Sequence, residues 1–317
     1  EEKIINLKAE VVDIAGNKTV INVASDKLLI DTIVPIISRV ESVDEDGNIK
    51  NGLFGIGDNI TLKFTFSDVL TLTDGEAKIG LDVNTIPSIA SADMQGIDNI
   101  SIVYTVIEGD SSGLLTFTGL TLPTGVLRDD AGNNMTVFTA DAGGSLENTS
   151  SVEVDGVKPG VFEVNDVYID GTNNVSGYWN SNSTKLIVAV GNIATQLDSS
   201  LIGGNVQIVG RVYGASGAGD WQNVGPATVL LPTVADGGGT EPEGVWNESD
   251  VNAPYSYGDF PGKILHFEVS AAELEAMPGW PDKSANFVEQ AVNADFTALI
   301  TDKAGNDTLM TVTSTTL

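Results

Sequence analysis

The sequence predicts an all-β protein built from tandem antiparallel β-sandwich domains arranged head to tail, and three observations support this fold class. Apolar and polar residues alternate with a period of two along short runs, about seven in each half of the chain, which is the number that a sandwich needs. Helix signals are few. Residues 296–317 also repeat residues 7–28, with nine of 22 positions identical and no gap, as expected for repeated domains.

The alternating runs predict the strands. The run NITLKFTFS (59–67) places its large apolar residues on one face, and Gly, Asn and Asp residues interrupt the chain between runs. The runs NISIVYTVI (99–107) and TKLIVAV (184–190) have the same pattern, and LMTVTSTTL (309–317) is rich in β-branched residues. Each run is expected to form an antiparallel strand.

One short helix is expected in SAAELEAM (270–277). Ser270 is a suitable N-cap, and Glu273 three residues later completes a capping box. Pro278 and Gly279 then end the helix. One short helix between strands is compatible with a sandwich.

The repeat and the linkers predict the domain boundaries. Residues 1–34 correspond to the last strands of a preceding domain plus a linker, and residues 35–157 and 158–317 form two complete domains. The segments LIDTIVP (29–35) and EVDGVKP (153–159) are the expected linkers, because each places an aspartate shortly before a proline that stiffens the joint. Since the chain starts inside this pattern, we expect it to be an excerpt of a longer protein.

Composition excludes several classes of function. The 317 residues include 44 acidic and 15 basic side chains, and the net charge is −29. The chain therefore lacks the basic footprint of a nucleic-acid-binding protein, and anionic membrane surfaces would repel it. It has no cysteine, which rules out disulfides and thiolate metal sites. No apolar stretch reaches the length of about 18 residues that predicts a membrane span.

The order and spacing of several motifs resemble the immunoglobulin-like repeats of large bacterial cell-surface adhesins and of some S-layer proteins. The resemblance is carried by IDTIVP, VDGVKP, GIGDNITLKFTFSD (55–68), VYTVIEGDSSGLLTF and LRDDAGN (between 103 and 133), SGYWNSNSTKLIVAV (176–190) and TDKAGND. It implies tandem immunoglobulin-like domains that are exported to the cell surface and often stiffened by calcium. A long insertion at residues 233–262 departs from the repeat.

The motif Asp-x-Ala-Gly-Asn occurs in VDIAGNKT (12–19), DDAGNNMT (129–136) and TDKAGNDT (301–308). Glycine can adopt a positive φ, and aspartate can hydrogen-bond to the backbone two residues on, so the motif predicts a tight turn between the last two strands of a domain. Short loops rich in Asp and Asn also provide the oxygen ligands that calcium prefers. If the turn faces the preceding domain, it meets the linker aspartate there.

The motif is thus expected to serve chiefly as a turn, and two interdomain calcium sites are the second interpretation, which a solvated acidic surface would rival. At the first junction the candidate ligands are Asp31, Asp129, Asp130 and Asn133, with Asp68 as a further contributor. At the second junction they are Asp155, Asp302 and Asn306, together with Asp44, Asp46 and Asn48 from the loop VDEDGNIKNG (43–52). The run DEDGN is similar to part of a calcium loop, but the later bidentate glutamate is missing, which excludes an EF-hand.

No constellation of residues predicts catalysis, and we expect no enzyme activity. His266 is the only histidine, it lies on a predicted strand, and no nucleophile elbow accompanies it. The insertion carries aromatic residues that suit a protein contact or sugar stacking, or that instead cap an end of the sandwich: Trp246, Tyr255, Tyr257 and Phe260.

Three functions follow as hypotheses. The first is a structural, extracellular segment of an adhesin stalk or S-layer array, whose partners are neighbouring immunoglobulin-like domains of the same or identical chains. The second is a module that binds a surface glycan or a protein through residues 233–262. The third is a filament subunit that assembles by strand addition. Nine Asn-x-Ser/Thr sequons suit a glycosylated surface layer, and the abundance of Asn, Ser and Thr in turns explains them equally well.

Overall fold

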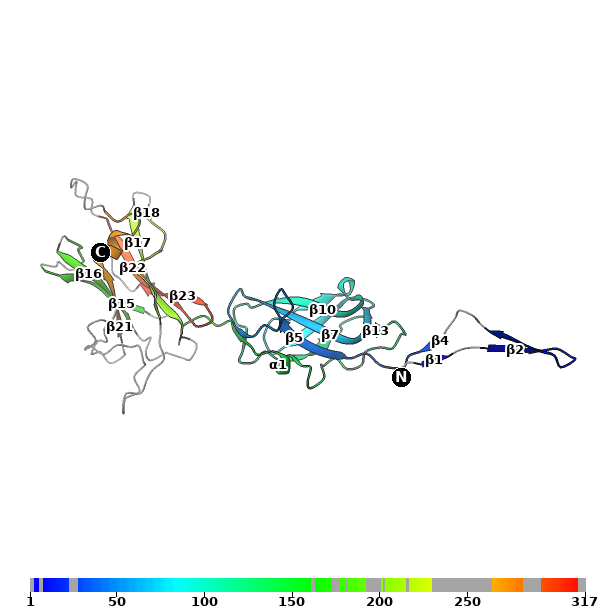
Figure 1. Cartoon of the computed structure of the whole chain (residues 1–317). Helices are drawn as coiled ribbons and strands as arrows, with labels where there is room; N and C mark the ends of the chain where they lie inside the picture. The colour runs from blue at the N-terminus through cyan, green and yellow to red at the C-terminus, as the bar shows by residue number, and fades with distance from the viewer. Residues whose placement is uncertain are drawn as a thin grey trace, which may run out of the picture. The chain divides into compact units, whose positions relative to one another are not determined.

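The structure, a computed structural model, confirms the predicted all-β class (Figure 1). It describes residues 3–5, 8–22, 28–160, 163–172, 177–180, 182–191, 201, 203–214, 217–229, 264–281 and 292–312. The chain divides into two compact units, residues 1–156 and 157–317. Within the described ranges, no helix is long and apolar enough to cross a membrane.

Two separate antiparallel strand pairs, which we call the ribbon, begin unit 1. Its strands are β1 (Lys3–Ile5) paired with β4 (Leu28–Ile30), and β2 (Lys8–Val12) paired with β3 (Lys18–Asn22). Residues 10–20 are all exposed, including Val11 and Val20 at 55% and 51%. Two-stranded ribbons have little stability of their own, because stable sheets bury at least one face.

The rest of unit 1 contains three sheets. In the largest, β7 pairs with β10, with β13 and with β5, while β11-β14-β6 and β12-β8-β9 form the other two. The strand bounds are β5 (Ile37–Val43), β6 (Gly52–Phe54), β7 (Asn59–Leu72), β8 (Glu76–Leu81), β9 (Ser88–Ala90), β10 (Gln95–Thr105), β11 (Ser111–Ser112), β12 (Phe117–Thr121), β13 (Leu127–Asp129) and β14 (Val152–Asp155). A 3-10 turn (Ser91–Asp93) and the helix α1 (Leu146–Thr149) complete it.

The core of unit 1 forms along β7. Ile60, Leu62 and Phe64 are fully buried, so the predicted alternation of NITLKFTFS is confirmed. Burial of each such side chain contributes about 1.5–3 kcal/mol. The ring of Phe64 packs edge-on against Phe117 of β12, with 5.4 Å between centroids, so two sheets meet face to face as in a sandwich.

The last part of unit 1 differs from the prediction. The turn that follows Asp129 does not lead into the final strand, because only one bridge, Arg128 with Asn134, pairs the two sides of the turn. The chain then contacts β5, where the hydroxyl of Thr149 donates to the carbonyl of Val40 at 2.5 Å. It returns as β14, which runs parallel to β6. A helical segment, α1, therefore lies between the turn and the closing strand, and its hydrogen bond to β5 holds it there.

The described part of unit 2 contains two sheets. One has the order β21-β16-β15-β24, and in the other β17 pairs with β22 and with three short strands, while β23 pairs with β22. The bounds are β15 (Glu163–Gly171), β16 (Ser183–Gly191), β17 (Asn205–Gly214), β18 (Gly217–Ala218), β19 (Gln222–Asn223), β20 (Thr228–Val229), β21 (Ile264–Ser270), β22 (Ala294–Thr301), β23 (Asp307–Leu309) and β24 (Thr311–Val312). Buried side chains of both sheets, such as Val188 and Ile300, share one core.

The predicted helix is confirmed as α2 (Ala271–Glu275). Its capping box is complete, because Ser270 Oγ accepts from the N–H of Glu273 and the carboxylate of Glu273 accepts from the N–H of Ser270. The run 309–317 was expected to be one strand and is divided in the described residues. Met310 is buried between β23 and β24, which belong to different sheets.

Candidate metal centre

The Asp-x-Ala-Gly-Asn motif forms a turn that its own side chains close. At Asp129 the backbone N–H donates to the carbonyl of Asn133 at 3.1 Å, and one carboxylate oxygen accepts from the N–H of Asn133 at 2.7 Å. The second oxygen accepts from the Asn133 amide at 2.8 Å. Gly132 has φ +94°, a conformation that favours glycine. We call this arrangement the clasped turn.

The same clasped turn occurs at Asp13–Asn17 and at Asp302–Asn306, as the repeat predicts. A fourth copy, Asp44–Asn48, was not recognised in the sequence, because Asp46 replaces the alanine of the motif. The pattern Asp-x-x-Gly-Asn would have found it. In the exposed copies, hydrogen bonds from the asparagine lower the pKa of the aspartate: the side chain of Asn17 acts on Asp13, and the N–H of Asn48 acts on Asp44.

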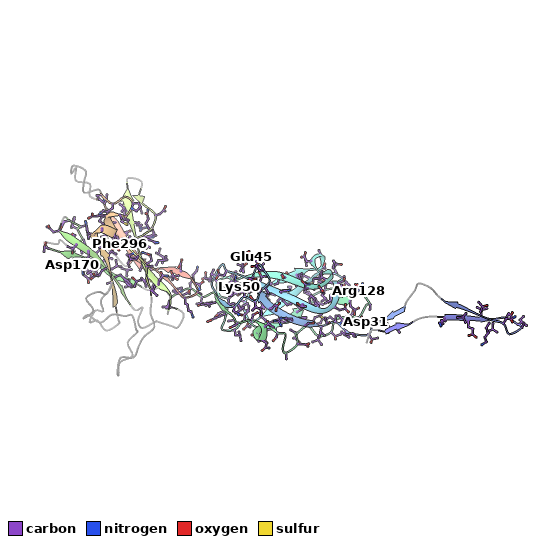
Figure 2. All side chains as sticks on the ribbon, viewed as in Figure 1. Asp31, Glu45, Lys50, Arg128, Asp170 and Phe296 are labelled. Atoms are coloured by element: carbon purple, nitrogen blue, oxygen red, sulfur yellow. The ribbon has the colours of Figure 1, made fainter. Side chains whose placement is uncertain are left out.

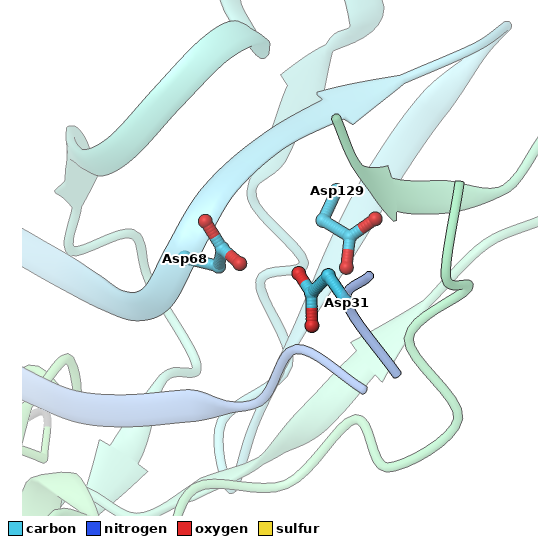
Figure 3. Close-up of side chains that lie close together, drawn as sticks. All are labelled: Asp31, Asp68 and Asp129. Atoms are coloured by element: carbon cyan, nitrogen blue, oxygen red, sulfur yellow. The ribbon is translucent and has the colours of Figure 1, made fainter. Parts of the chain in front are cut away.

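Three carboxylates meet beside the clasped turn of Asp129. Asp31 follows β4, Asp68 lies in β7 and Asp129 ends β13, so the fold brings together three separate segments (Figure 3). One oxygen from each lies within 4.8 Å of the others. Asp129 is buried and the other two are half-buried. The Asn133 amide also donates to the carbonyl of Asp31 at 3.3 Å, which holds the linker against the turn.

Two of the three carboxylates in this centre, those of Asp31 and Asp68, are only partly satisfied by hydrogen bonds. Asp31 accepts from the N–H of Ile33 at 2.9 Å and Asp68 from that of Val69 at 2.7 Å, in each case with one oxygen. No lysine or arginine in the described ranges forms a salt bridge with any of the three aspartates. Like charges so close repel one another, and a hard divalent cation removes the repulsion. The donor set fits calcium, with water supplying the remaining ligands.

The other candidate ligands do not belong to this group of three carboxylates. Asp130 is exposed, and the Asn133 amide borders the centre, where it donates to Asp129 and to the carbonyl of Asp31. Asp44, Asp46 and Asn48 form the fourth clasped turn in unit 1, and Asp155 ends β14 of the same unit. Asp302 and Asn306 are buried in unit 2, at 2% and 3% exposure. The second predicted calcium site therefore draws its residues from both units, and it stays a prediction.

The proposed binding surface of Trp246, Tyr255, Tyr257 and Phe260 lies outside the described residues, as does the whole insertion at 233–262. His266 is placed in β21, where it pairs with Ala189 of β16. The described ranges thus add nothing to the binding-module hypothesis.

A buried aspartate that was not recognised in the sequence, Asp110, organises the loops that hold Gly156, the last residue of unit 1. Asp110 is fully buried, and its carboxylate accepts from the hydroxyls of Tyr104 and Thr85, both at 2.7 Å. Two backbone N–H groups, of Thr85 and Ile107, complete the set at 3.0 and 3.2 Å. Burial alone raises the pKa of Asp110, but these hydrogen bonds outweigh it and the pKa is lowered. The pKa of Tyr104 is raised, by burial first and by its bond to Asp110 second.

This network holds the linker residue Gly156. The N–H of Gly156 donates to the carbonyl of Asp110 at 2.6 Å, and Gly109 donates to the carbonyl of Gly156 at 2.9 Å. A Cβ at Gly156 would meet the carbonyl oxygens of Ile107 and, at 2.6 Å, of Asp110. Only glycine therefore fits here. The glycine of VDGVKP was the one feature of the sequence that could have indicated this close backbone contact.

Unit 2 holds the linker residues that follow. The Asn306 amide donates to the carbonyl of Val157 at 3.4 Å, and the hydroxyl of Thr308 donates to that of Pro159 at 2.7 Å. Because Gly156 is bonded within unit 1 and Val157 within unit 2, the two anchoring points are consecutive in the sequence.

Unit 2 also has a charged cluster, between β17 and β22. The guanidinium of Arg211 donates twice to one carboxylate oxygen of Asp295, at 3.0 and 2.8 Å, and lies 4.4 Å from the ring centre of Trp221. The hydroxyl of Tyr213 donates to the same oxygen at 2.6 Å. The cluster fixes the segment before β19 onto the sheet, and its polar groups are bonded to one another.

Comparison of the chain with protein-family models and with curated proteins finds no match.

Proposed function

We propose that the chain is a structural segment of an extracellular cell-surface protein, in which immunoglobulin-like β-sandwich domains form a stiff spacer. The observation that carries the proposal is the linker between the units, where the last residue bonded within unit 1 and the first bonded within unit 2 are neighbours. A linker with free residues behaves as a flexible coil whose reach grows with its length. Here no residue is left over for that coil.

The ribbon supports an array of more than two domains. Its residues 7–28 align with 296–317, so Ala9 and Val11 correspond to Ala298 and Ile300, which are fully buried in unit 2. Val11 is 55% exposed. The alignment therefore matches this hairpin to β22 and β23 of unit 2, and it supports the assignment of residues 1–34 to a preceding domain and its linker.

The spacer proposal is tested by distance measurements between the units. Because the chain has no cysteine, single cysteines at the exposed Asp93 and Tyr178 give specific spin-label sites. Pulsed electron spin resonance is expected to show a narrow distance distribution. Insertion of Gly-Ser-Gly-Ser between Gly156 and Val157 is expected to broaden it. Equal widths for the two proteins would refute the stiff linker. Proteolytic release of the protein from intact cells tests its location.

Calcium is the proposed cofactor of the centre formed by Asp31, Asp68 and Asp129. Support comes from the hard oxygen donors, the lack of a described counter-charge and the position of Asp31 in the linker. A cation there ties the segment before β5 to β7 and β13. It stabilises unit 1 by mass action, by about 2.7 kcal/mol when its free concentration is 100 times Kd.

Calcium titration followed by calorimetry and circular dichroism tests this assignment. Calcium is expected to raise the unfolding midpoint of unit 1, whereas chelator lowers it. Asp68→Asn is expected to abolish the shift. Asp130→Asn, which removes an exposed carboxylate next to the centre, is the matched control and is expected to keep the shift. Heat of binding that survives Asp68→Asn unchanged would place calcium elsewhere.

A further inference from the structure

The described ranges contain seven of the nine Asn-x-Ser/Thr sequons, and the structure separates them by what the asparagine amide does. The described sequons begin at Asn17, Asn59, Asn99, Asn134, Asn148, Asn182 and Asn306, while Asn174 and Asn247 lie outside the described residues. A glycan attached to an asparagine replaces one amide hydrogen, and it also needs open space at the nitrogen. Both conditions can be read from the hydrogen bonds and the exposure of each side chain.

Two asparagines cannot carry a glycan in the folded unit. Asn306 is 3% exposed, and its amide donates to both Asp302 and the carbonyl of Val157. The amide of Asn148 likewise donates twice, to the carbonyl of Ala142 and to the hydroxyl of Ser145. Substitution of either nitrogen would break a bond that the fold uses.

Two further asparagines are intermediate. The amide of Asn17 donates to Asp13 and that of Asn99 donates to Asp98, each once. Both side chains are exposed and each keeps one unbonded hydrogen. Neither is assigned.

Three asparagines meet both conditions. Asn59, Asn134 and Asn182 are exposed, and their amide nitrogens donate to no protein group in the described part of the chain. At Asn59 the amide oxygen accepts from the hydroxyl of Thr105 at 2.6 Å, which orients the amide group while its nitrogen stays unbonded.

We propose that Asn59, Asn134 and Asn182 are N-glycosylation sites, a proposal that rests on export of the chain. The donor is a lipid-diphosphate-linked oligosaccharide. The amide nitrogen forms a bond to the anomeric carbon of the first sugar, the bond between that carbon and the diphosphate oxygen breaks, the lipid diphosphate leaves and the amide loses one proton. Attachment precedes folding at Asn59, because the third residue of its sequon, Thr61, is paired on both sides within the sheet.

Site-specific mass spectrometry of the protein isolated from the cells that make it tests the proposal. Sugar adducts are expected on the peptides of Asn59, Asn134 and Asn182, and unmodified asparagine is expected at Asn148 and Asn306. Unmodified asparagine at any two of the three sites, or an adduct at Asn306 in folded protein, overturns it.

Unfolding of variants made without glycans checks the basis of the assignment. Asn134→Gln, at a side chain with no hydrogen bond to the described residues, is expected to leave the unfolding midpoint of unit 1 unchanged, whereas Asn306→Gln lowers that of unit 2 because its two amide bonds are displaced. If the unit 1 and unit 2 variants lowered the unfolding midpoints of their units by the same amount, the assignment would be overturned.

Two combinations of results separate this proposal from the stiff spacer. Unmodified asparagines with a narrow distance distribution between the units would refute glycosylation and leave the spacer standing. Glycosylated asparagines with a broad distribution would refute the spacer and leave glycosylation standing.

Discussion

Replacement of Asp110 by asparagine tests whether the buried network stabilises the end of unit 1. The carboxylate accepts two hydroxyl bonds of 2.7 Å, from Tyr104 and Thr85. Bonds to a charged acceptor contribute about 1.5–3 kcal/mol each. Both hydroxyls and the N–H of Ile107 donate to one carboxylate oxygen, whereas the N–H of Thr85 donates to the other. Asparagine removes the charge and keeps only one acceptor oxygen, so its NH₂ group must face one of these two sets of donors. Asp110→Asn is therefore expected to lower the free energy of unfolding by about 2–4 kcal/mol.

The two units report separately on their unfolding. All four tryptophans lie after residue 157, so tryptophan fluorescence follows unit 2 while circular dichroism follows both units. Asp110→Asn is expected to lower the thermal midpoint of unit 1 by about 6 °C or more. The fluorescence transition of unit 2 serves as an internal control. Asp93→Asn, at an exposed position, is the matched variant and is expected to leave both transitions in place.

The pH dependence adds a second, independent test. The pKa of Asp110 is lowered in the folded protein, whereas an unfolded aspartate titrates near about 3.9. The stabilisation is therefore complete above about pH 4 and is lost as the pH falls through the folded pKa. The difference between wild type and Asp110→Asn is expected to narrow in that range. A difference below about 0.5 kcal/mol at neutral pH, or one that does not depend on pH, would refute the reasoning.

Three further predictions concern the linker, the charged cluster and the clasped turn. Gly156→Ala is expected to destabilise unit 1 by about 1–3 kcal/mol, because a Cβ meets two carbonyl oxygens, and an unchanged dichroism midpoint would contradict this. Arg211→Lys is expected to lower the free energy of unfolding of unit 2, followed by fluorescence, by about 1–2 kcal/mol, since lysine cannot form the paired bonds and the ring contact together; a lysine variant as stable as the wild type would argue against that geometry. Asp302→Ala is expected to cost about 1–3 kcal/mol in unit 2, because Asn306 is buried and loses its acceptor, whereas Asp13→Ala in the exposed ribbon leaves both midpoints unchanged.

Features that depend on neighbouring residues were predictable from the sequence. The alternation in β7, the capping box of Ser270 and Glu273 and the clasped turn all follow from residues within a few positions of one another. The meeting of Asp31 with Asp129 was expected from the order of linker and turn, and the structure places their carboxylates together with Asp68.

Features that depend on distant partners were not predictable. Asp110 bonds to Thr85, 25 residues away, and the sequence carries no sign that this one aspartate among many acidic residues is buried. The parallel pairing of β14 with β6 joins residues about 100 positions apart and is not expected from a pattern of antiparallel hairpins. The copy at Asp44 was not found because the motif was defined with an alanine at its third position. The turn itself needs only the aspartate, the glycine and the asparagine.

The change of sheet at Met310 has a mechanical consequence. β24 runs parallel to β15, the first strand of unit 2, and pairs Glu163 with Thr311 and Val164 with Val312. β23, one residue earlier, belongs to the opposite sheet and pairs with β22. Tension between the two ends of the unit pulls the parallel strands in opposite directions along their axes, so their hydrogen bonds are loaded in shear rather than opened one after another. The same tension reaches both sheets through a single buried residue.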